Sequence, residues 1–305
     1  MSFNLTEAKR SIAKLRLAIA GAAGSGKTYS ALLIAYGLCG DWSKIAVIDT
    51  ERGSANLYEH LCQGGKKYFT GQLNAPFTPK KYIDAIHACE EAGMEVIIID
   101  SLSHAWYAEG GMLDIHSEIT RRQTTQNSFT AWREITPLHN KLVDAILTSP
   151  VHVIVTLRTQ TEYVLETDAR GKQVPKKVGM KPIFRQGIDY EMTLVFDLDA
   201  THTATITKSR STEFPVGDQI IPDVETGKKL LAWLNSGADI PKCADCGEDI
   251  QPYGKMSALQ VAYETERKYG RQLCAKCGAK AKELMYGEIS TKKPIPDPLA
   301  GGEER

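Results

Sequence analysis

The chain of 305 residues carries 37 basic and 37 acidic side chains, so its formal net charge is zero, and 42% of its residues are hydrophobic. This length favours one large domain with an appendage, or two domains. The neutral balance excludes binding to nucleic acid through overall charge, so such binding would need a local basic patch. No apolar run reaches the roughly 18 residues of a membrane span, and the opening MSFNLTEAKRSIAKL lacks the apolar core of a secretory signal.

Seven cysteines are an odd number, and four of them form two CxxC pairs. This usage indicates a metal site in a reducing compartment rather than a disulfide framework. We therefore expect a cytoplasmic protein with no membrane partner.

Four short apolar segments are rich in Ile, Val, Leu and Ala: residues 15–20, 45–49, 96–100 and 151–157. They lack the alternation of a half-exposed strand, so they favour parallel strands buried on both faces. Thr78-Pro79 predicts a helix start with a capping hydroxyl and a proline at its first position, and Gly93 predicts its end. The alternation of strands and helices predicts a doubly wound α/β fold with a mainly parallel central sheet.

After Arg158 the pattern changes. The segment TEYVLETDARGKQVPKKVG predicts a hairpin around Arg170-Gly171. Residues 192–197 and 203–207 favour two more strands, and VETGKKLLAWLN favours a closing helix.

The residues Asn235-Ser236-Gly237 are typical of a chain break between domains. We expect one domain at residues 1–237, a linker at 238–242 and a small cysteine module at 243–286. The Pro/Gly-rich residues 287–305 are typical of a disordered tail.

A glycine-rich turn follows the first apolar strand and opens a helix: Gly21-Ala22-Ala23-Gly24-Ser25-Gly26-Lys27-Thr28-Tyr29. Residues 21–28 fit G-x-x-x-x-G-K-[ST], whose small residues let backbone N–H groups converge on phosphate oxygens. In such a loop the lysine, here Lys27, reaches the β- and γ-phosphates and supports catalysis, and the hydroxyl of Thr28 holds Mg²⁺. We expect residues 21–29 to bind a nucleoside triphosphate.

Two further strand ends supply carboxylates. EVIIIDS ends in Asp100, where the carboxyl edge of a parallel sheet binds ligands, so Asp100 is the second Mg²⁺ residue we expect. Ser101 stands where many ATPases place a glutamate, so the hydrolytic base must come from elsewhere. IAVIDTERG offers Glu51 as the base that polarises water, with Asp49 as its competitor. Alternatively, Glu51 is a solvated charge or pairs with Arg52.

The P-loop, VIDTERG and VIIIDSL together resemble the RecA-like core ATPases. More closely, DSLSHAWYAEGG, NSFTAWREITPLHN and TGKKLLAWLN resemble the phage-encoded members linked to single-strand annealing and recombination. The resemblance covers about residues 12–235. It implies a RecA-like P-loop NTPase fold, ATP and Mg²⁺ as ligands, Glu51 as the catalytic glutamate, and the cytoplasm of a bacterial host if a phage encodes the chain.

The resemblance also implies a homo-oligomer, a ring or a filament, with ATP at subunit interfaces. Lys208 and Arg210 in TATITKSRS match a Lys-x-Arg element that inserts into the adjacent site, where an arginine stabilises developing phosphate charge. Exposed charges at a strand end are the alternative. Arg158 stands where the family places a polar γ-phosphate sensor, commonly Asn or Gln.

RecA-like proteins hold single-stranded DNA with loops that match residues 103–130 and 159–190 here. The second loop carries six cations without an intervening acid: Arg170, Lys172, Lys176, Lys177, Lys181 and Arg185. Such a patch suits phosphate contacts, and four aromatic residues could stack on bases: Trp106, Tyr107, Tyr163 and Phe184. A solvated hairpin whose lysines keep its edge soluble is the alternative. Phage single-strand DNA-binding or nuclease proteins are further partners that the resemblance implies.

Cys243-Ala-Asp-Cys246 and Cys274-Ala-Lys-Cys277 enclose 27 residues, 247–273. Four thiolates predict a closed, structural Zn²⁺ site. The spacing exceeds that of a two-knuckle ribbon, and a helix in SALQVAYETERKYG accounts for the excess. YETERKYGRQLCAKCG also resembles a small zinc module appended to phage recombination proteins. We expect the other cysteines to be inert thiols, and His104 to be a packed loop residue.

Three functions stay open on the sequence. The first is a Mg²⁺-ATP-dependent DNA recombination or annealing ATPase that assembles on single strands. The second is a DNA-binding scaffold in which nucleotide only stabilises the oligomer. The third is a P-loop small-molecule kinase, which would need an arginine-bearing lid and no cation from a neighbour.

Overall fold

The computed structural model describes residues 13–62, 64–122, 128–167, 173–236, 241–254, 256 and 258–290. Packing divides the chain into two compact units, one at Ile12–Ser236 and the other containing Gly237–Arg305. Each unit is described here by itself.

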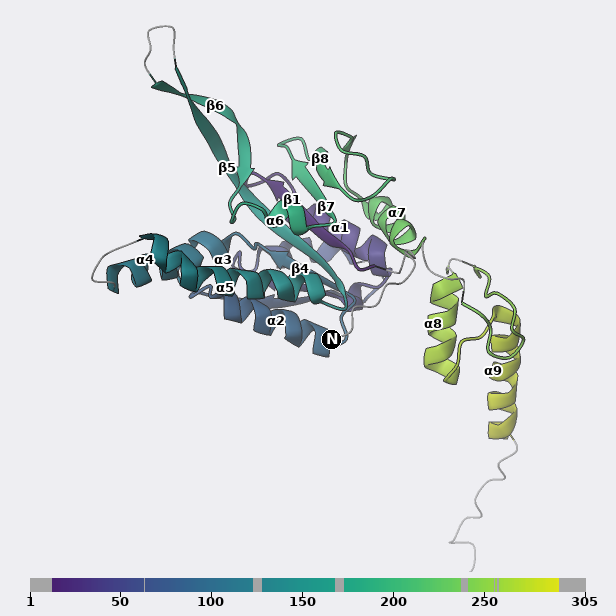
Figure 1. The fold of residues 1–305 in the computed structure, drawn as a ribbon. Coiled ribbons are helices and arrows are strands. Elements are labelled where there is room, and N and C mark those ends of the chain that lie inside the picture. Colours follow the sequence, from purple (N-terminus) through teal and green to yellow (C-terminus); the bar gives the residue numbers. More distant parts are fainter. Residues whose placement is uncertain are drawn as a thin grey trace, which may run out of the picture. The chain divides into compact units, whose positions relative to one another are not determined.

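The larger unit contains both strands and helices (Figure 1). In chain order they are β1 Arg16–Gly21, α1 Lys27–Cys39, β2 Ile45–Asp49, β3 Phe69–Gln72, α2 Pro79–Glu91, β4 Val96–Asp100, α3 His104–Tyr107, α4 Met112–Arg122, α5 Ser128–Thr148, β5 His152–Thr167, β6 Gln173–Pro182, α6 Ile188–Glu191, β7 Leu194–Leu198, β8 Ala204–Ser209, β9 Gln219–Ile220 and α7 Val224–Asn235. Two short 3₁₀ helices, Trp42–Lys44 and Ser54–Leu61, flank β2.

The described strands form one nine-stranded sheet with the order β3-β2-β4-β5-β1-β7-β8-β9, and β6 pairs with β5. Strands β3, β2, β4, β5, β1 and β7 pair in parallel, whereas β8, β9 and β6 join antiparallel. The predicted mainly parallel α/β fold is therefore confirmed. All residues of β1, β2 and β4 are buried, as expected for strands covered on both faces.

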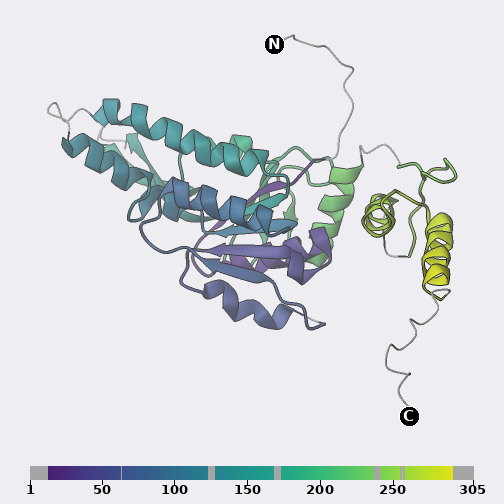
Figure 2. The same cartoon turned by 90° about the horizontal axis from the view of Figure 1, so that it is seen from below.

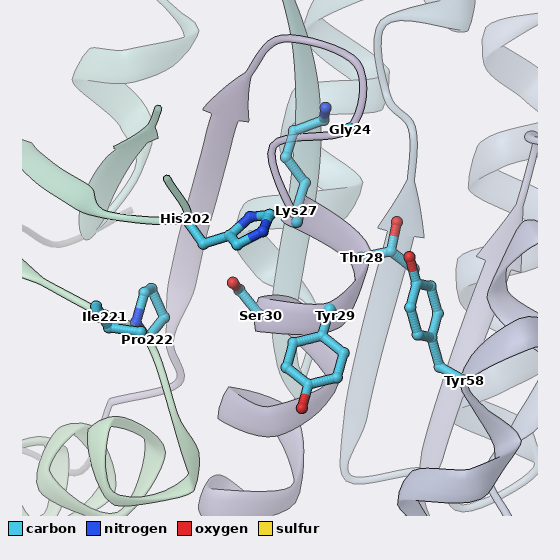
Figure 3. Close-up of a pocket in the computed structure, with 10 residues that line it drawn as sticks. Gly24, Lys27, Thr28, Tyr29, Ser30, Tyr58, His202, Ile221 and Pro222 are labelled. Carbon is cyan, nitrogen blue, oxygen red and sulfur yellow. The ribbon is translucent and has the colours of Figure 1, made fainter. Parts of the chain in front are cut away.

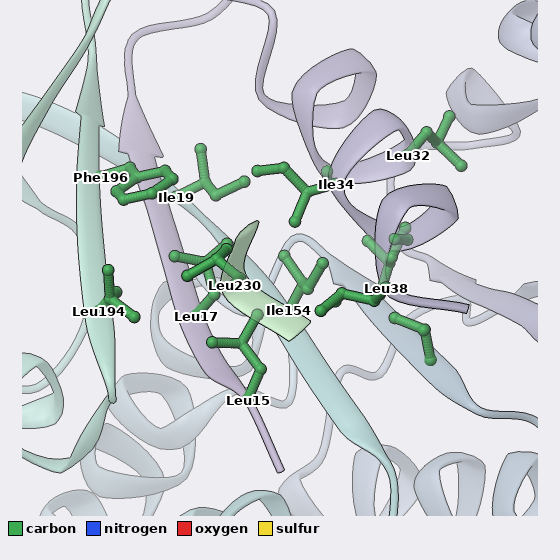
Figure 4. Close-up of a cluster of buried hydrophobic side chains, with 14 of the residues drawn as sticks. Leu15, Leu17, Ile19, Leu32, Ile34, Leu38, Ile154, Leu194, Phe196 and Leu230 are labelled. Atoms are coloured by element: carbon green, nitrogen blue, oxygen red, sulfur yellow. The ribbon is translucent and has the colours of Figure 1, made fainter. Parts of the chain in front are cut away.

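Helices cover the two faces of the sheet (Figure 2). Leu17 and Ile19 of β1 pack with α1 and α7 in one cluster, which Figure 4 shows around Leu38 and Leu230. Ala18 and Ala20 face the other cluster, which contains residues of α2 and α5. Because side chains alternate along a strand, one apolar strand supplies both halves of the core.

Three local expectations need correction. Thr78 does occupy the N-cap position of α2, but its hydroxyl makes no capping hydrogen bond. Much of residues 103–130, expected as a loop, is helical, because α3, α4 and the start of α5 lie there. Helix α9 runs to Ser290, so residues 287–290 of the predicted tail are helical.

The smaller unit contains α8 Ala258–Tyr269 and α9 Ala275–Ser290. Single β-bridges join Lys242 to Asp249 and Tyr253 to Met256. Its buried core is small: Cys243, Ile250, Val261, Ala262, Leu273 and Ala281. A core of this size gives little stability by itself, so the unit needs a further cross-link.

Candidate active site

The turn between β1 and α1 has the conformation of a phosphate-binding loop. Gly24 (φ 80°) and Gly26 (φ 87°) lie in the left-handed region that favours glycine. Gly26 is the N-cap of α1, and a Cβ atom there would lie 2.8 Å from Nδ1 of His202. The free N–H groups of the first turn of α1 therefore meet this loop, and such a helix start binds anions.

Two side chains of the loop fit a triphosphate. Lys27 Nζ donates a hydrogen bond to the carbonyl oxygen of Ala22 at 2.7 Å. The pKa of Lys27 is lowered because the ammonium is partly buried, and the charges of Asp100 and Glu51 oppose this effect. The Ser25 hydroxyl is buried without a hydrogen-bond partner among the described residues. Because a buried polar group without a partner is costly, this hydroxyl and the ammonium suit an incoming anion.

Thr28 and Asp100 meet where β4 ends beside α1. The Thr28 hydroxyl donates to Oδ2 of Asp100 at 2.6 Å, and the Thr156 hydroxyl of β5 donates to Oδ1 at 2.5 Å. Burial raises the pKa of Asp100, and these two hydrogen bonds oppose that rise. A hydroxyl and a carboxylate in this arrangement are the oxygen ligands that Mg²⁺ takes in P-loop proteins.

The two carboxylates that end β2 have different environments. Both oxygens of Asp49 accept backbone hydrogen bonds, from Glu51 N at 2.6 Å and from Ala55 N at 3.1 Å. Asp49 therefore holds the turn and the 3₁₀ helix that follow β2. The Glu51 carboxylate is bonded to side chains instead, and it is only 22% exposed.

Arg158 is the residue that holds Glu51. Its Nε donates to Oε1 of Glu51 at 2.8 Å and its Nη2 donates to Oε2, while Nη1 donates to the Tyr107 hydroxyl at 3.0 Å. Arg158 is also the register partner of Gly21, the first residue of the P-loop. The guanidinium and the Glu51 carboxylate form an ion pair with two hydrogen bonds. This pair links the segment after β2 to the part of β5 that lies beside the phosphate-binding loop. The sequence left open that Glu51 is a solvated charge or pairs with Arg52. The structure shows neither, because the partner of Glu51 is Arg158.

A histidine lies behind this pair. His104 Nδ1 lies 2.7 Å from the Thr50 hydroxyl, and Nε2 lies 4.0 Å from Oε1 of Glu51. The backbone N–H of Ser101 donates to the same hydroxyl at 2.8 Å. Burial lowers the pKa of His104, and Glu51 opposes this effect. The expected packed histidine therefore also supports the candidate base.

The P-loop lines a cavity of about 490 Å³ whose outer walls were not expected from the sequence (Figure 3). Besides P-loop residues and Tyr29, the wall includes Tyr58, His202, Ile221 and Pro222. His202 Nδ1 lies 3.0 Å from the Ser25 carbonyl oxygen, and Asp199 holds the turn before it through the N–H groups of Thr201 and Thr203. These residues come from distant loops without a motif, so only the fold could place them.

Lys208 and Arg210, the expected trans cations, lie together at the end of β8. Lys208 Nζ donates to the carbonyl oxygens of Tyr190 and Met192, and Arg210 Nη2 donates to that of Tyr190 at 3.0 Å. Both cations therefore contact the end of α6 within their own chain.

Three of the expected DNA-binding cations, Lys176, Lys177 and Lys181, belong to β6, and Arg185 follows this strand. Arg170 and Lys172 lie outside the described residues, and the side chains of Tyr163, Lys176 and Lys177 lie outside them too. Lys181 is exposed, and Arg185 lies 5.7 Å above the Trp132 ring. Two of the expected stacking residues, Trp106 and Phe184, are neighbours with ring centroids 5.8 Å apart.

The four cysteines of the smaller unit come together. The Sγ atoms of Cys243, Cys246, Cys274 and Cys277 all lie within 4.8 Å of one another. Cys274 and Cys277 lie at the N-terminus of α9. The donor set fits a structural Zn²⁺ site. Among the described residues no other cluster of three or more His, Cys, Asp or Glu side chains has a geometry that could hold a metal.

The fold and the P-loop geometry define a P-loop nucleoside triphosphatase. A family model described as the AAA domain, AAA_24, matches residues 13–222, and the chain belongs to this family. It is therefore a nucleotide-binding protein of the ATPase class. A search of curated proteins found no match. In the described part of the chain no helix has both the length and the apolar character needed to cross a membrane.

Proposed function

We propose that this chain is a Mg²⁺-ATP-dependent ATPase of DNA recombination or single-strand annealing, of the RecA-like phage type. It binds single-stranded DNA, forms a ring or filament with ATP at subunit interfaces, and works with phage single-strand DNA-binding or nuclease proteins. The AAA domain and the P-loop support the ATPase part of this proposal. The resemblance of residues 12–235 to the phage group supports the rest.

The geometry of the site supports these hydrolytic roles. Lys27 would neutralise phosphate charge, Thr28 and Asp100 would hold Mg²⁺, and Glu51 would orient and polarise the attacking water once Arg158 releases it. Bound Mg²⁺ would neutralise charge on the phosphate oxygens. A carboxylate held in a two-bonded ion pair is a poor base, because its lone pairs are engaged and its negative charge is stabilised. ATP turnover therefore requires the Glu51–Arg158 pair to open.

One observation carries the link to DNA: Arg158 connects the phosphate site to the basic hairpin. Its side chain holds Glu51, its register partner is Gly21, and its carbonyl oxygen accepts a hydrogen bond from Ile183 N at 2.6 Å, beyond the end of β6. The guanidinium has donors that suit a γ-phosphate. Exchange of Glu51 for phosphate at Arg158 would couple ATP state to the base of β5–β6, where we expect DNA.

The test is ATP hydrolysis by the full chain with and without a single-stranded oligonucleotide. We expect the oligonucleotide to raise turnover, Lys27→Ala to abolish nucleotide binding, and Glu51→Gln to lower turnover by roughly 10²–10⁴-fold while ATP still binds. Glu51→Gln also separates the alternatives, because a scaffold would keep annealing strands without turnover. If single-stranded DNA changes neither turnover nor assembly, the recombination function is wrong.

The interface role of Arg210 has its own test. Arg210→Ala and Glu51→Gln subunits are each expected to be inactive, and mixing them should restore part of the ATPase activity. Mixed interfaces would pair an intact glutamate from one subunit with an intact arginine from the next, and a trans arginine raises turnover by about 10³–10⁵-fold. Oligomers that mix, as shown by native mass spectrometry, yet recover no activity would contradict the trans role.

A small-molecule kinase is the weaker alternative. Its arginine-bearing lid would have to cover the P-loop cavity, whereas the wall found there consists of Tyr58, His202, Ile221 and Pro222. Phosphate transfer to small hydroxyl compounds, measured against hydrolysis, would identify it.

A further inference from the structure

A second cavity, of about 440 Å³, lies at the base of hairpin β5–β6. It shares no lining residue with the P-loop cavity. Its floor is the sheet face that carries α2 and α5, where β1 presents Ala18 and Ala20. Small side chains in the central strand leave room that a larger aliphatic residue would fill.

One wall of this cavity is aromatic. The rings of Trp106 and Phe184 both line it, with centroids 5.8 Å apart and planes tilted by 45°. Trp132 stacks on Trp106 at 5.9 Å, and His139 lies 5.6 Å from Phe184. This second layer fixes the wall, so a flat ligand would meet a rigid aromatic surface.

The cavity also contains a carboxylate that the proposed ATPase mechanism does not use. Asp197 of β7 lines the cavity and is half-buried. No hydrogen bond or ion pair joins its side chain to any residue in the described ranges, and burial, followed by Asp199, raises its pKa. Gln160 of β5 lines the same space. A half-buried carboxylate without a donor is costly, so it suits a ligand that supplies an N–H group.

Cations stand at the same cavity. Lys181 and Arg185 line it, and the Arg185 guanidinium lies over the Trp132 ring. A planar wall, an N–H acceptor and two cations are the complement of an aromatic base with an amino group and an attached phosphate. An apolar metabolite would leave the Asp197 carboxylate without a hydrogen-bond donor.

We propose that this cavity binds one nucleotide unit, with its base against Trp106 and Phe184, its amino group at Asp197 and its phosphate at Lys181 and Arg185. We take this nucleotide to be part of a single DNA strand that runs along the hairpin. This assignment of the source rests on the proposed DNA-binding function. A free nucleotide has the same chemistry, and the experiment separates the two sources. Cytosine, adenine and guanine carry an exocyclic amino group with two N–H donors, whereas thymine offers only its ring N3–H, so the site prefers the first three.

The test uses the full chain and labelled 12-mers of dC, of dT and of abasic deoxyribose phosphate, with fluorescence anisotropy as the readout. We expect dC to bind about tenfold more tightly than dT, because a hydrogen bond to a charged group is at stake. The abasic strand should bind more weakly than both. Asp197→Asn should remove most of the dC preference, since an amide also donates to thymine, whereas Asp218→Asn, an exposed charge outside the cavity, should keep it.

A second measurement identifies the source. In the second measurement dCMP is titrated into the Lys27→Ala variant, whose P-loop we expect not to bind nucleotide, and tryptophan fluorescence is recorded. Trp106→Phe should remove the change in fluorescence. A base-dependent strand affinity supports the proposal with the strand as source. A dCMP response without strand binding supports the cavity but overturns the proposed DNA function. Strands that bind equally with and without bases, with no dCMP response, overturn the cavity and leave the proposed function standing. No binding in either arm overturns both.

Discussion

Two buried polar side chains lie at the amino ends of the central strands. Arg16 is 6% exposed, and its guanidinium donates to the carbonyl oxygens of Leu147 and Val151, so it closes the end of α5. His152, 5% exposed, accepts a hydrogen bond from Leu15 N at Nδ1, at 3.0 Å. Burial, then the charges of Lys14 and Arg16, lower the pKa of His152 to about 3.

This histidine predicts an acid-sensitive fold. In the unfolded chain its pKa is about 6.5, so between that value and about 3 the unfolded state binds more protons. The contribution to stability is present above pH 6.5 and is lost as pH falls. We expect a loss of about 2 kcal/mol between pH 7 and pH 5. The variant His152→Asn keeps a hydrogen-bond acceptor near Leu15 N, and an asparagine side chain does not titrate. Its free energy of unfolding should therefore not show this part of the loss between pH 7 and pH 5.

Urea unfolding at the two pH values, followed by tryptophan fluorescence, measures the effect. All four tryptophans lie in the larger unit, so the signal reports on that unit alone. His104 and His139 also have lowered pKa values, and they remain in the variant. Equal pH dependence in both proteins would show that His152 does not titrate in this way.

At the residue scale the sequence predicted one contact of the site and missed others. The Thr28–Asp100 contact followed from the motif and from the edge at which parallel strands end. The Glu51–Arg158 pair did not, because it depends on β5 lying beside β1 with Arg158 in register with Gly21. His202 carries no motif, and its contact with Ser25 arises from the turn after β7.

At the scale of the elements, helices α1 and α7 come into close backbone contact at one glycine from each, Gly37 and Gly227. A Cβ on Gly37 would lie 2.2 Å from the Val224 carbonyl oxygen, and one on Gly227 would lie 2.2 Å from that of Ile34. Both helices contribute to the core that covers one face of the sheet. Because α1 begins at the P-loop, the position of α7 supports the position of the nucleotide site.

We expect Gly37→Ala and Gly227→Ala each to destabilise the larger unit by about 1–3 kcal/mol, because the backbones must separate to admit a methyl group. Gly71→Ala is the matched control, since nothing lies within 4 Å of its added Cβ. Urea unfolding measures all three variants. If Gly37→Ala and Gly227→Ala were as stable as Gly71→Ala, the close contact between α1 and α7 would not contribute to stability.

The helices after β4 show where sequence patterns fell short. Residues 103–130 resembled a DNA-holding loop by position, yet α4 and α5 pack Ile119, Trp132 and Ile135 against the core. The apolar residues of these helices are separated by polar ones, and tertiary burial stabilises such helices more than their propensity does. The strands β1, β2 and β4 were easier to predict, because burial on both faces demands continuous apolar runs.

For the whole molecule, the smaller unit is expected to depend on zinc. Its six buried core residues and clustered thiols predict about one Zn²⁺ per chain. Chelation should release this zinc and unfold α8 and α9, whereas ATPase activity of the larger unit should change by less than about twofold, because each unit has its own core. Zinc release with a chromogenic chelator and circular dichroism measure both effects.

The variant Cys274→Ser with Cys277→Ser should give the same result, and Cys39→Ser, a thiol in the larger unit, is the control. No zinc in the purified protein, or unchanged helicity after its removal, would contradict the structural role.

The sequence by itself determined the α/β class, the phosphate-binding turn, the proximity of Thr28 and Asp100, and the cysteine set. These depend on short-range spacing and on the polarity of strand ends, which a linear pattern records. Only the tertiary structure decided that Arg158 holds Glu51, that His202 and Tyr58 enclose the P-loop cavity, and that Asp197 lies in a second cavity with Trp106 and Phe184. Those contacts join residues far apart in the chain, and their geometry follows from strand order and register, which no local pattern specifies.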